Sequence, residues 1–122
     1  MTESQNPKQY DLEDRTLQFA RSVRAFARQL PKTQSNFEDV KQLIRASGSV
    51  GANYIEANES LSKKDFVMRI KISRKESKEC RYWLLLLECG NQPDLEATRK
   101  ELIQESTELM KILSAIMRRV EV

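Results

Sequence analysis

The chain has 122 residues, 39% hydrophobic and 32% charged, with three glycines, three prolines and a formal net charge of +3. This composition predicts a single all-α domain, because it contains too few glycines and prolines to form the turns of a many-stranded sheet. The sequence contains no histidine. The commonest general base, the imidazole ligand of most zinc sites and the Glu-x-x-His pairs of di-iron bundles are therefore missing. We predict no catalytic residue, metal site or cofactor.

The first predicted helix follows a short tail. Residues 1–10 carry no helical periodicity, so we predict a disordered or frayed N-terminal tail there and a four-helix bundle domain at residues 11–122. The helix should begin near Asp11 or Asp14, either of which could cap it, and should end at Pro31. Its buried face follows the spacing of threes and fours typical of a helix. The face consists of Leu12, Thr16, Phe19, Val23, Phe26 and Leu30.

The second predicted helix runs from near Ser35 to about Asn58 and has an unusual middle. Residues 46–52 are nearly all small, and each of the two glycines among them costs about 1 kcal/mol relative to alanine inside a helix. Close approach by a neighbouring helix would offset that cost. The face that this helix should bury consists of Phe37, Val40, Leu43, Ile44, Ser47, Val50, Gly51, Tyr54 and Ile55.

The third predicted helix supplies a suitable neighbour. Residues 62–65 resemble a capping box, although Asp65 stands where Glu or Gln is usual, and Gly90 followed by Asn91 and Pro93 should end the helix. The centre of its heptad-like face is also small, so we predict that small residues of the second and third helices face one another. This face consists of Phe66, Ile70, Ser73, Ser77, Cys80, Leu84 and Leu87.

The fourth predicted helix is capped by Asp94 and continues to about Val120. Glu101, Glu105 and Glu108 repeat at spacings of four and three beside lysines and are interpreted as a solvated face. Because all connections are short, successive helices should be antiparallel neighbours, which predicts an up-down-up-down four-helix bundle. The buried face of this helix consists of Leu95, Leu102, Ser106, Leu109, Leu113, Ile116 and Val120.

The fourth helix and the end of the third carry more apolar residues than one core needs. A helix that is apolar all round is stable only when every side is covered, so we predict self-association through the surplus residues. The alternative is that they thicken the core or lie beneath loops. They are Trp83, Leu85, Leu86, Ile103, Met110 and Met117.

Positive charge is concentrated on the third helix. Between Leu61 and Tyr82, eight basic residues oppose three acidic ones, a net charge of +5 that leaves −2 for the rest of the chain. At about 100° per residue the lysines lie opposite the small residues and should face outward. A smaller basic row lies on the first helix. The candidate nucleic-acid-binding residues are Lys64, Lys71, Arg74, Lys75, Lys78 and Arg81 of the third helix and Arg21, Arg24 and Arg28 of the first.

Two interpretations of this basic face remain open. An ordinary charged helix face would keep the protein soluble. A phosphate-binding surface would bind RNA without sequence preference and with strong salt dependence, and it would repeat around a ring if protomers assembled into one. The scarcity of exposed aromatic residues argues against sequence-specific recognition of single strands.

The remaining features concern compartment and cysteines. The sequence has no apolar stretch long enough for a signal peptide or a membrane span, which predicts a cytoplasmic protein with no membrane partner. Cys80 and Cys89 lie nine residues apart on one predicted helix and cannot pair with each other, so we predict reduced thiols in the core.

Two segments carry a family resemblance. Residues 42–57 read Q-L-I-R-A-S-G-S-V-G-A-N-Y-I-E-A, and residues 74–84 read R-K-E-S-K-E-C-R-Y-W-L. From about residue 17 to residue 87 the chain therefore resembles the bacterial four-helix-bundle family of 23S rRNA intervening-sequence proteins. The corresponding family patterns are Q-x-x-R-x-x-x-S-I-x-x-N-I-x-E-G and A-x-x-S-x-x-E-x-x-x-x-L. Family members often have Pro where Gly51 stands and Gly where Ala57 stands.

The resemblance implies an assembly and partners. It implies an antiparallel four-helix bundle that forms a ring-shaped homopentamer. Relatives include the accessory variability proteins of diversity-generating retroelements, which have a basic surface and bind a reverse transcriptase and nucleic acid, so structured RNA or a reverse transcriptase is an implied partner. Arg45, Asn53 and Glu56 match the family motif and are interpreted first as buried hydrogen-bonding or ion-pairing groups that serve the structure.

These observations give one leading hypothesis and one alternative. The leading hypothesis is a non-enzymatic, oligomeric accessory protein that binds RNA, or an RNA-handling partner, through the basic face of the third helix. The alternative is a protein–protein scaffold, or a family member of unknown function, whose basic face binds an acidic partner.

Overall fold

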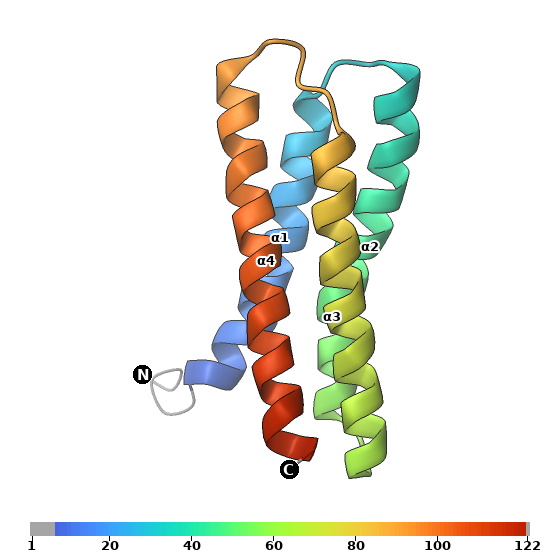
Figure 1. Ribbon diagram of the computed structural model, residues 1–122, viewed down its shortest axis with the longest axis vertical. Helices are drawn as coiled ribbons and strands as arrows, with labels where there is room; N and C mark the ends of the chain where they lie inside the picture. Colours follow the sequence, from blue (N-terminus) through green and yellow to red (C-terminus); the bar gives the residue numbers. More distant parts are fainter. Residues whose placement is uncertain (1–6, 122) are drawn as a thin grey trace.

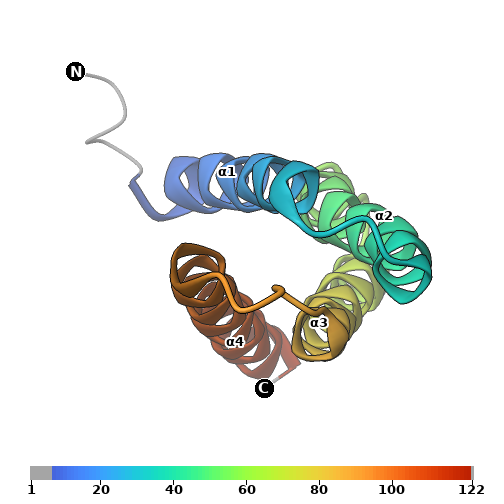
Figure 2. The same ribbon diagram turned by 90° about the horizontal axis from the view of Figure 1, so that it is seen from above.

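A computed structural model describes residues 7–121 of the chain, with side chains from residue 12 onward. Four helices follow one another: α1 (Pro7–Gln29), α2 (Gln34–Asn58), α3 (Lys63–Leu86) and α4 (Pro93–Glu121). Successive helices run in opposite directions (Figure 1), and each helix packs against its neighbours in the order α1–α2–α3–α4–α1 (Figure 2). The prediction of an all-α four-helix bundle is confirmed.

The core runs along the bundle axis and is formed by the faces that the spacing predicts. Val23, Leu43, Ile70, Leu109 and Leu113 are fully buried, and each belongs to the expected face of its own helix. The predicted residues Val40, Phe66 and Ile116 are half-buried and pack against this core. None of the helices in the described part of the chain is long and apolar enough to cross a membrane.

Two residues of the predicted face of α2 are exposed. Phe37 is 62% exposed and Ile55 is 47% exposed. Both lie on the flank of α2 that faces α1, where each lines a surface hollow together with α1 residues. Because α1 packs less closely against α2 than α3 does, this flank is only partly covered, and the prediction of burial is wrong for these two side chains.

The seam between α2 and α3 is built from small residues, as predicted. Ala46, Ser47, Ser73 and Ser77 are fully buried. The Ser73 hydroxyl donates a 2.7 Å hydrogen bond to the Val50 carbonyl across the seam. Side chains this short allow the two helix backbones to approach closely enough for such a bond.

The two glycines of α2, in contrast, face α1. A Cβ atom at Gly51 would lie 2.8 Å from Thr16 Oγ1, closer than real Cβ contacts allow. A Cβ atom at Gly48 would make an ordinary 3.7 Å contact with Arg24 Nη2. The expectation that the third helix offsets the cost of both glycines is therefore wrong, because the tight contact is between Gly51 and α1.

Helix starts differ from prediction where proline is present. α1 begins at Pro7, before Asp11 and Asp14, and so takes in the last four residues of the predicted tail, while residues 1–6 lie outside the described part. α4 begins at Pro93, so Asp94 lies in the first turn instead of capping the helix. Proline suits the first helical position, because its missing N–H would be unpaired there in any case.

The caps of α2 and α3 are hydroxyl side chains. Thr33 Oγ1 accepts a 3.1 Å hydrogen bond from the backbone N–H of Asn36, and Ser62 Oγ accepts one of 3.1 Å from the backbone N–H of Asp65. The Ser62 contact confirms the predicted start of the third helix.

The end of α3 is capped by a side chain from α4. The helix ends at Leu86, four residues before Gly90. Arg99 Nη1 donates hydrogen bonds to the carbonyl oxygens of Leu84, Leu85 and Leu87 at 3.3, 3.2 and 2.8 Å. Its other nitrogens bind the Glu96 carboxylate at 2.7–3.2 Å. Arg99 thus satisfies carbonyl groups that a helix end leaves unpaired, and a positive charge at that position also suits the helix dipole.

One buried amide joins two connections at the same end of the bundle. Asn36 is 2% exposed, and its Nδ2 donates to the carbonyl oxygens of Pro31 and Glu88 at 3.0 and 2.9 Å. Its Oδ1 accepts a 3.0 Å hydrogen bond from the backbone N–H of Glu88. The connection between α1 and α2 is therefore fixed to the one between α3 and α4 (Figure 1).

An ion-pair cluster joins α1 to α4. Arg15 donates to both carboxylate oxygens of Glu105, at 2.7 and 2.8 Å, and to Glu108 at 3.2 Å. The hydrogen bond to Glu105 is the main cause that raises the pKa of Arg15 above its usual range. The interpretation of a solvated carboxylate face is therefore wrong for Glu105, which is half-buried, whereas Glu101 and Glu108 are exposed.

Both cysteines are free and buried. Cys80 lies in α3, and burial raises the pKa of its thiol to about 12. Cys89 is 2% exposed but lies in the connection after α3, not on the same helix as Cys80. Burial also raises the pKa of Cys89. The prediction of core thiols is confirmed, and its placement of both on one helix is wrong.

Candidate nucleic-acid interface

The outward side of α3 carries a row of lysines. Lys64, Lys71, Lys75 and Lys78 are all exposed. Ile70, Ser73 and Leu84 on the opposite side are fully buried, and their packing fixes the rotation of the helix. At 1.5 Å per residue the row spans about 21 Å. The structure therefore places the lysines as the sequence predicts.

The lysines of this row are only weakly engaged by carboxylates. Lys71 Nζ lies 3.7 Å from Glu121, and Lys75 Nζ lies 3.7 Å from Glu79. The two lysine side chains are 53% and 64% exposed. Pairs this long and this exposed typically contribute less than about 1 kcal/mol. A polyanion could therefore replace these carboxylates at little cost.

Two arginines lie on one flank of the row. Arg81 is exposed and Arg74 is half-buried. On the other flank, Glu76 and Glu79 bind Arg45 of α2 at 3.4 and 3.2 Å. Because Arg74 and Arg81 lie on the opposite side of the helical wheel from these glutamates, they border α4.

The basic row of α1 lies elsewhere. Arg21 and Arg28 are exposed, whereas Arg24 is half-buried and its Nη1 donates a 3.2 Å hydrogen bond to the Ala20 carbonyl. Arg21 and Arg24 border a hollow between α1 and α2. Since α1 and α3 occupy diagonal positions of the bundle (Figure 2), the structure does not bring the two predicted basic rows together.

Two basic residues of α4 were not predicted to belong to a basic face. Lys111 and Arg118 are exposed and seven residues apart, so they lie on one face of the helix. Arg118 is also one turn from Glu121, the residue that contacts Lys71 of α3. The spacing of seven was visible in the sequence, whereas the packing of α4 directly beside α3 is given by the structure.

The residues of the family motif are polar but less buried than expected. Arg45 is 53% exposed and pairs with Glu76, which is 8% exposed. Asn53 Nδ2 donates to the Ser49 carbonyl at 2.9 Å, and its Oδ1 accepts a 3.0 Å hydrogen bond from Arg69. Glu56 is exposed. Arg45 and Asn53 thus link α2 to α3, whereas the prediction of burial is wrong for Arg45 and Glu56.

The predicted self-association residues divide into three groups. Leu85 and Leu86 are 51% and 45% exposed. Trp83, Ile103 and Met110 are half-buried, and Trp83 Nε1 is the one buried side-chain nitrogen or oxygen of the described residues that lacks a hydrogen-bond partner. Met117 is 6% exposed and belongs to the core, so its assignment to an outer surface is wrong, because its side chain packs inward against the other helices.

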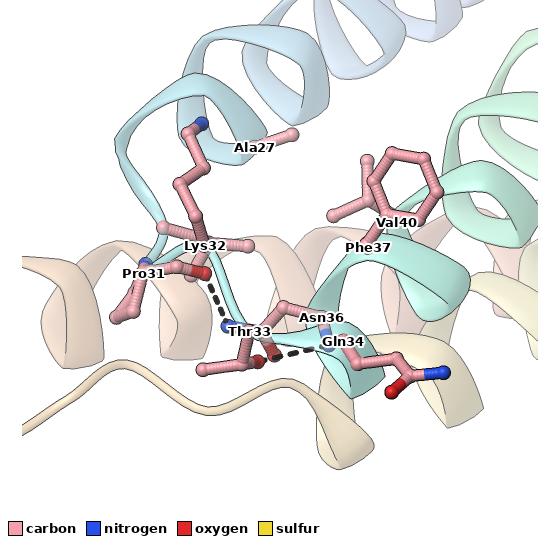
Figure 3. A pocket seen from close by; sticks show the side chains of 9 residues that line it. Ala27, Pro31, Lys32, Thr33, Gln34, Asn36, Phe37 and Val40 are labelled. Carbon is pink, nitrogen blue, oxygen red and sulfur yellow. Dashed lines mark hydrogen bonds between the residues drawn. The ribbon is translucent and has the colours of Figure 1, made fainter.

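A surface pocket lies at the connection between α1 and α2. Its volume is about 310 Å³, and its lining combines polar side chains of residues 32–34 and 36 with apolar ones, among them Phe37 and Val40 on the α2 side and Ala27 and Pro31 on the α1 side (Figure 3). Lys41 Nζ lies 4.5 Å from the centre of the Phe37 ring. The described residues contain no cluster of three or more side chains suited to hold a metal ion, and this pocket brings no acid–base pair together.

Comparisons with known proteins identify relatives. A family model described as 23S rRNA-intervening sequence protein matches residues 8–115. The chain is 32% identical to a crystallised protein of unknown function from the S23 ribosomal protein family of Bacteroides thetaiotaomicron. That likeness covers 86% of this chain and 96% of the other, with a TM-score of 0.74. No curated protein matches the chain.

Proposed function

The chain belongs to the family of 23S rRNA-intervening sequence proteins, and from this membership we propose that it is a non-enzymatic, RNA-associated accessory protein. It binds RNA through the lysine row of α3. The observation that carries the proposal is that four lysines of this row are exposed and at most loosely paired. A linear row of cations suits the phosphate backbone, and the contacts are independent of base sequence because only Tyr82 is available beside the row for stacking.

The test is an electrophoretic shift of a structured RNA at low salt. We expect the unaltered chain to bind and the double variant Lys75→Glu with Lys78→Glu to bind at least about tenfold more weakly, because two phosphate contacts become repulsive. The matched control is Lys32→Glu with Lys41→Glu, which makes the same change in charge at exposed residues near the α1–α2 connection. Equal losses in both variants would show that net charge, and not this row, determines binding.

An acidic protein is the alternative partner for the same row. Affinity capture with and without nuclease separates the two partners, because a complex bridged by RNA is lost on digestion and a direct protein complex is retained. A retained complex that depends on Lys75 and Lys78 would replace RNA binding with a scaffold function.

Self-association is the second part of the proposal. Leu85 and Leu86 are about half exposed at the end of α3, close in sequence to Tyr82, which is 57% exposed. Apolar side chains that adjoin in this way are best covered by a second copy, and on the family resemblance we propose that the assembly is a homopentamer. Light scattering should give five times the protomer mass, and Leu85→Asp should lower it. A monomeric mass at high micromolar concentration would contradict this part alone.

A further inference from the structure

Charge on α4 is divided between two flanks. Glu105 and Glu108 face α1, where both bind Arg15. The second oxygen of Glu108 accepts a 2.9 Å hydrogen bond from Gln104. The acidic flank of α4 is thus engaged by polar neighbours, away from α3.

The outward side of α4 carries the exposed basic residues Lys111 and Arg118. Two contacts align the antiparallel helices: Lys71 with Glu121 near one end, and Arg99 with the carbonyl oxygens at the end of α3 near the other. Lys111 and Arg118 lie between these two contacts on α4, just as the second half of the lysine row does on α3. The neighbouring outward sides of α3 and α4 therefore both carry basic residues along the same stretch of the bundle.

From this arrangement we propose that the RNA bound by the chain is double-stranded, and that Lys111 and Arg118 of α4 are phosphate-binding residues. The inference deepens the proposed function and depends on it. The lysine row of α3 contacts the phosphates of one strand, and the α4 residues contact those of the other strand across a groove.

The geometry of the two rows supports a duplex. The axes of packed helices lie about 8–10 Å apart, so the two outward rows run side by side and are separated by at least the diameter of one helix. Proteins that bind duplex RNA by shape contact phosphates on both sides of its wide, shallow minor groove. A single strand could follow one row but could not occupy both without bending back on itself. Single-strand binding surfaces also offer aromatic platforms, whereas Tyr82 is the one exposed aromatic residue described on α3 or α4.

The experiment compares a perfect RNA duplex of about 20 base pairs with one of its strands, by fluorescence anisotropy over a range of salt concentrations. At about 100 mM salt we expect the duplex to bind at least about tenfold more tightly, with a steeper salt dependence, because more phosphates are contacted. Lys111→Glu with Arg118→Glu should lower duplex affinity about tenfold or more and leave single-strand affinity within about twofold. The matched control Lys32→Glu with Lys41→Glu should leave the preference for duplex unchanged.

The outcomes separate this inference from the proposed function. Equal affinity for duplex and single strand would overturn the duplex assignment and leave RNA binding by α3 intact. An equal effect of the α4 variant on both RNAs would overturn the assignment of a second strand to α4. Absence of binding to either RNA would overturn the proposed function and this inference with it. Circular dichroism of each variant shows whether its helices are retained. The duplex and the single strand are also compared on the unaltered chain, so the duplex assignment is tested even if a variant fails to fold.

Discussion

The two flanks of α2 differ in what lies against them. Toward α3 the contact consists of fully buried small residues, and a hydroxyl of one helix bonds the backbone of the other. Toward α1 the contact includes the close approach at Gly51 and a 2.8 Å hydrogen bond from Asn58 to Glu13, and it leaves Phe37 and Ile55 exposed. The other edge of α1 is held by the half-buried cluster around Arg15. α2, α3 and α4 therefore form the closely packed part of the bundle, and α1 is the helix most easily loosened.

The largest expected effect comes from filling the α2–α3 seam. Ser73→Leu places a large side chain at a fully buried site, where overpacking costs about 1–3 kcal/mol, and it removes a buried hydrogen bond worth about 1 kcal/mol. We expect the free energy of unfolding, measured in urea, to fall by about 3 kcal/mol or more. Ser73→Ala, which leaves the seam unfilled, should cost about 1 kcal/mol. Equal losses in the two variants would mean that close approach is not what this seam requires.

A smaller effect is expected where α2 meets α1. Gly51→Ala should lower the free energy of unfolding by about 1 kcal/mol, because crowding against Thr16 outweighs the gain of up to about 1 kcal/mol in helix propensity. In a Thr16→Ala background the nearest atom is gone, and the same substitution should be neutral or stabilising. The double-mutant cycle measures the coupling between the two positions, and a coupling near zero would contradict the close contact.

A third prediction concerns the cluster between α1 and α4. Arg15→Gln removes a bidentate pair that is about 30% exposed, so we expect a loss of about 0.5–1 kcal/mol. Hydrogen exchange should then accelerate in α1 and remain unchanged in the middle of α3. Lys41→Gln, which removes the more exposed pair with Glu38, is the control and should change neither quantity. Faster exchange throughout the bundle would refute the idea that α1 loosens alone.

The smallest effect is a dependence on acid. Hydrogen bonds from Gln104 and then from Arg15 lower the pKa of Glu108. A carboxyl group with a depressed pKa in the folded state stabilises the fold above its ordinary pKa, and this contribution is lost as the pH falls through the depressed value. The difference in stability between the unaltered chain and Glu108→Gln should therefore shrink as the pH is lowered below about 4. A difference that stays constant down to pH 2 would contradict the shift.

The buried faces could be predicted because they depend on local spacing. Side chains three and four residues apart share one side of a helix, so positions such as Val23, Ile70 and Leu113 were identifiable without tertiary contacts. The outward direction of the α3 lysines followed from the same periodicity. The exposure of Phe37 and Ile55 could not be predicted in this way. It depends on how closely α1 packs against α2, which the spacing within α2 does not determine.

The polar contacts between helices could not be predicted in the same way. Arg15 and Glu105 are 90 residues apart in sequence, and Asn36 and Glu88 are 52 apart. A charged or amide side chain on a helix surface is compatible with many partners and with water, so its residue type does not select one. The position of Lys111 and Arg118 relative to the α3 lysines could not be predicted for the same reason, since it depends on how α4 packs beside α3.

The reactivity of the two buried thiols reports on local opening of the fold. A thiol with a raised pKa and no access to solvent reacts with an alkylating reagent only while its surroundings are open. The reactivity of Cys80 reports on the C-terminal half of α3, and that of Cys89 reports on the connection that Asn36 holds in place. The labelling rates of the unaltered protein therefore report local opening at two separate places. An RNA or a second protomer that stabilises one of these regions should slow the labelling of its cysteine more than that of the other.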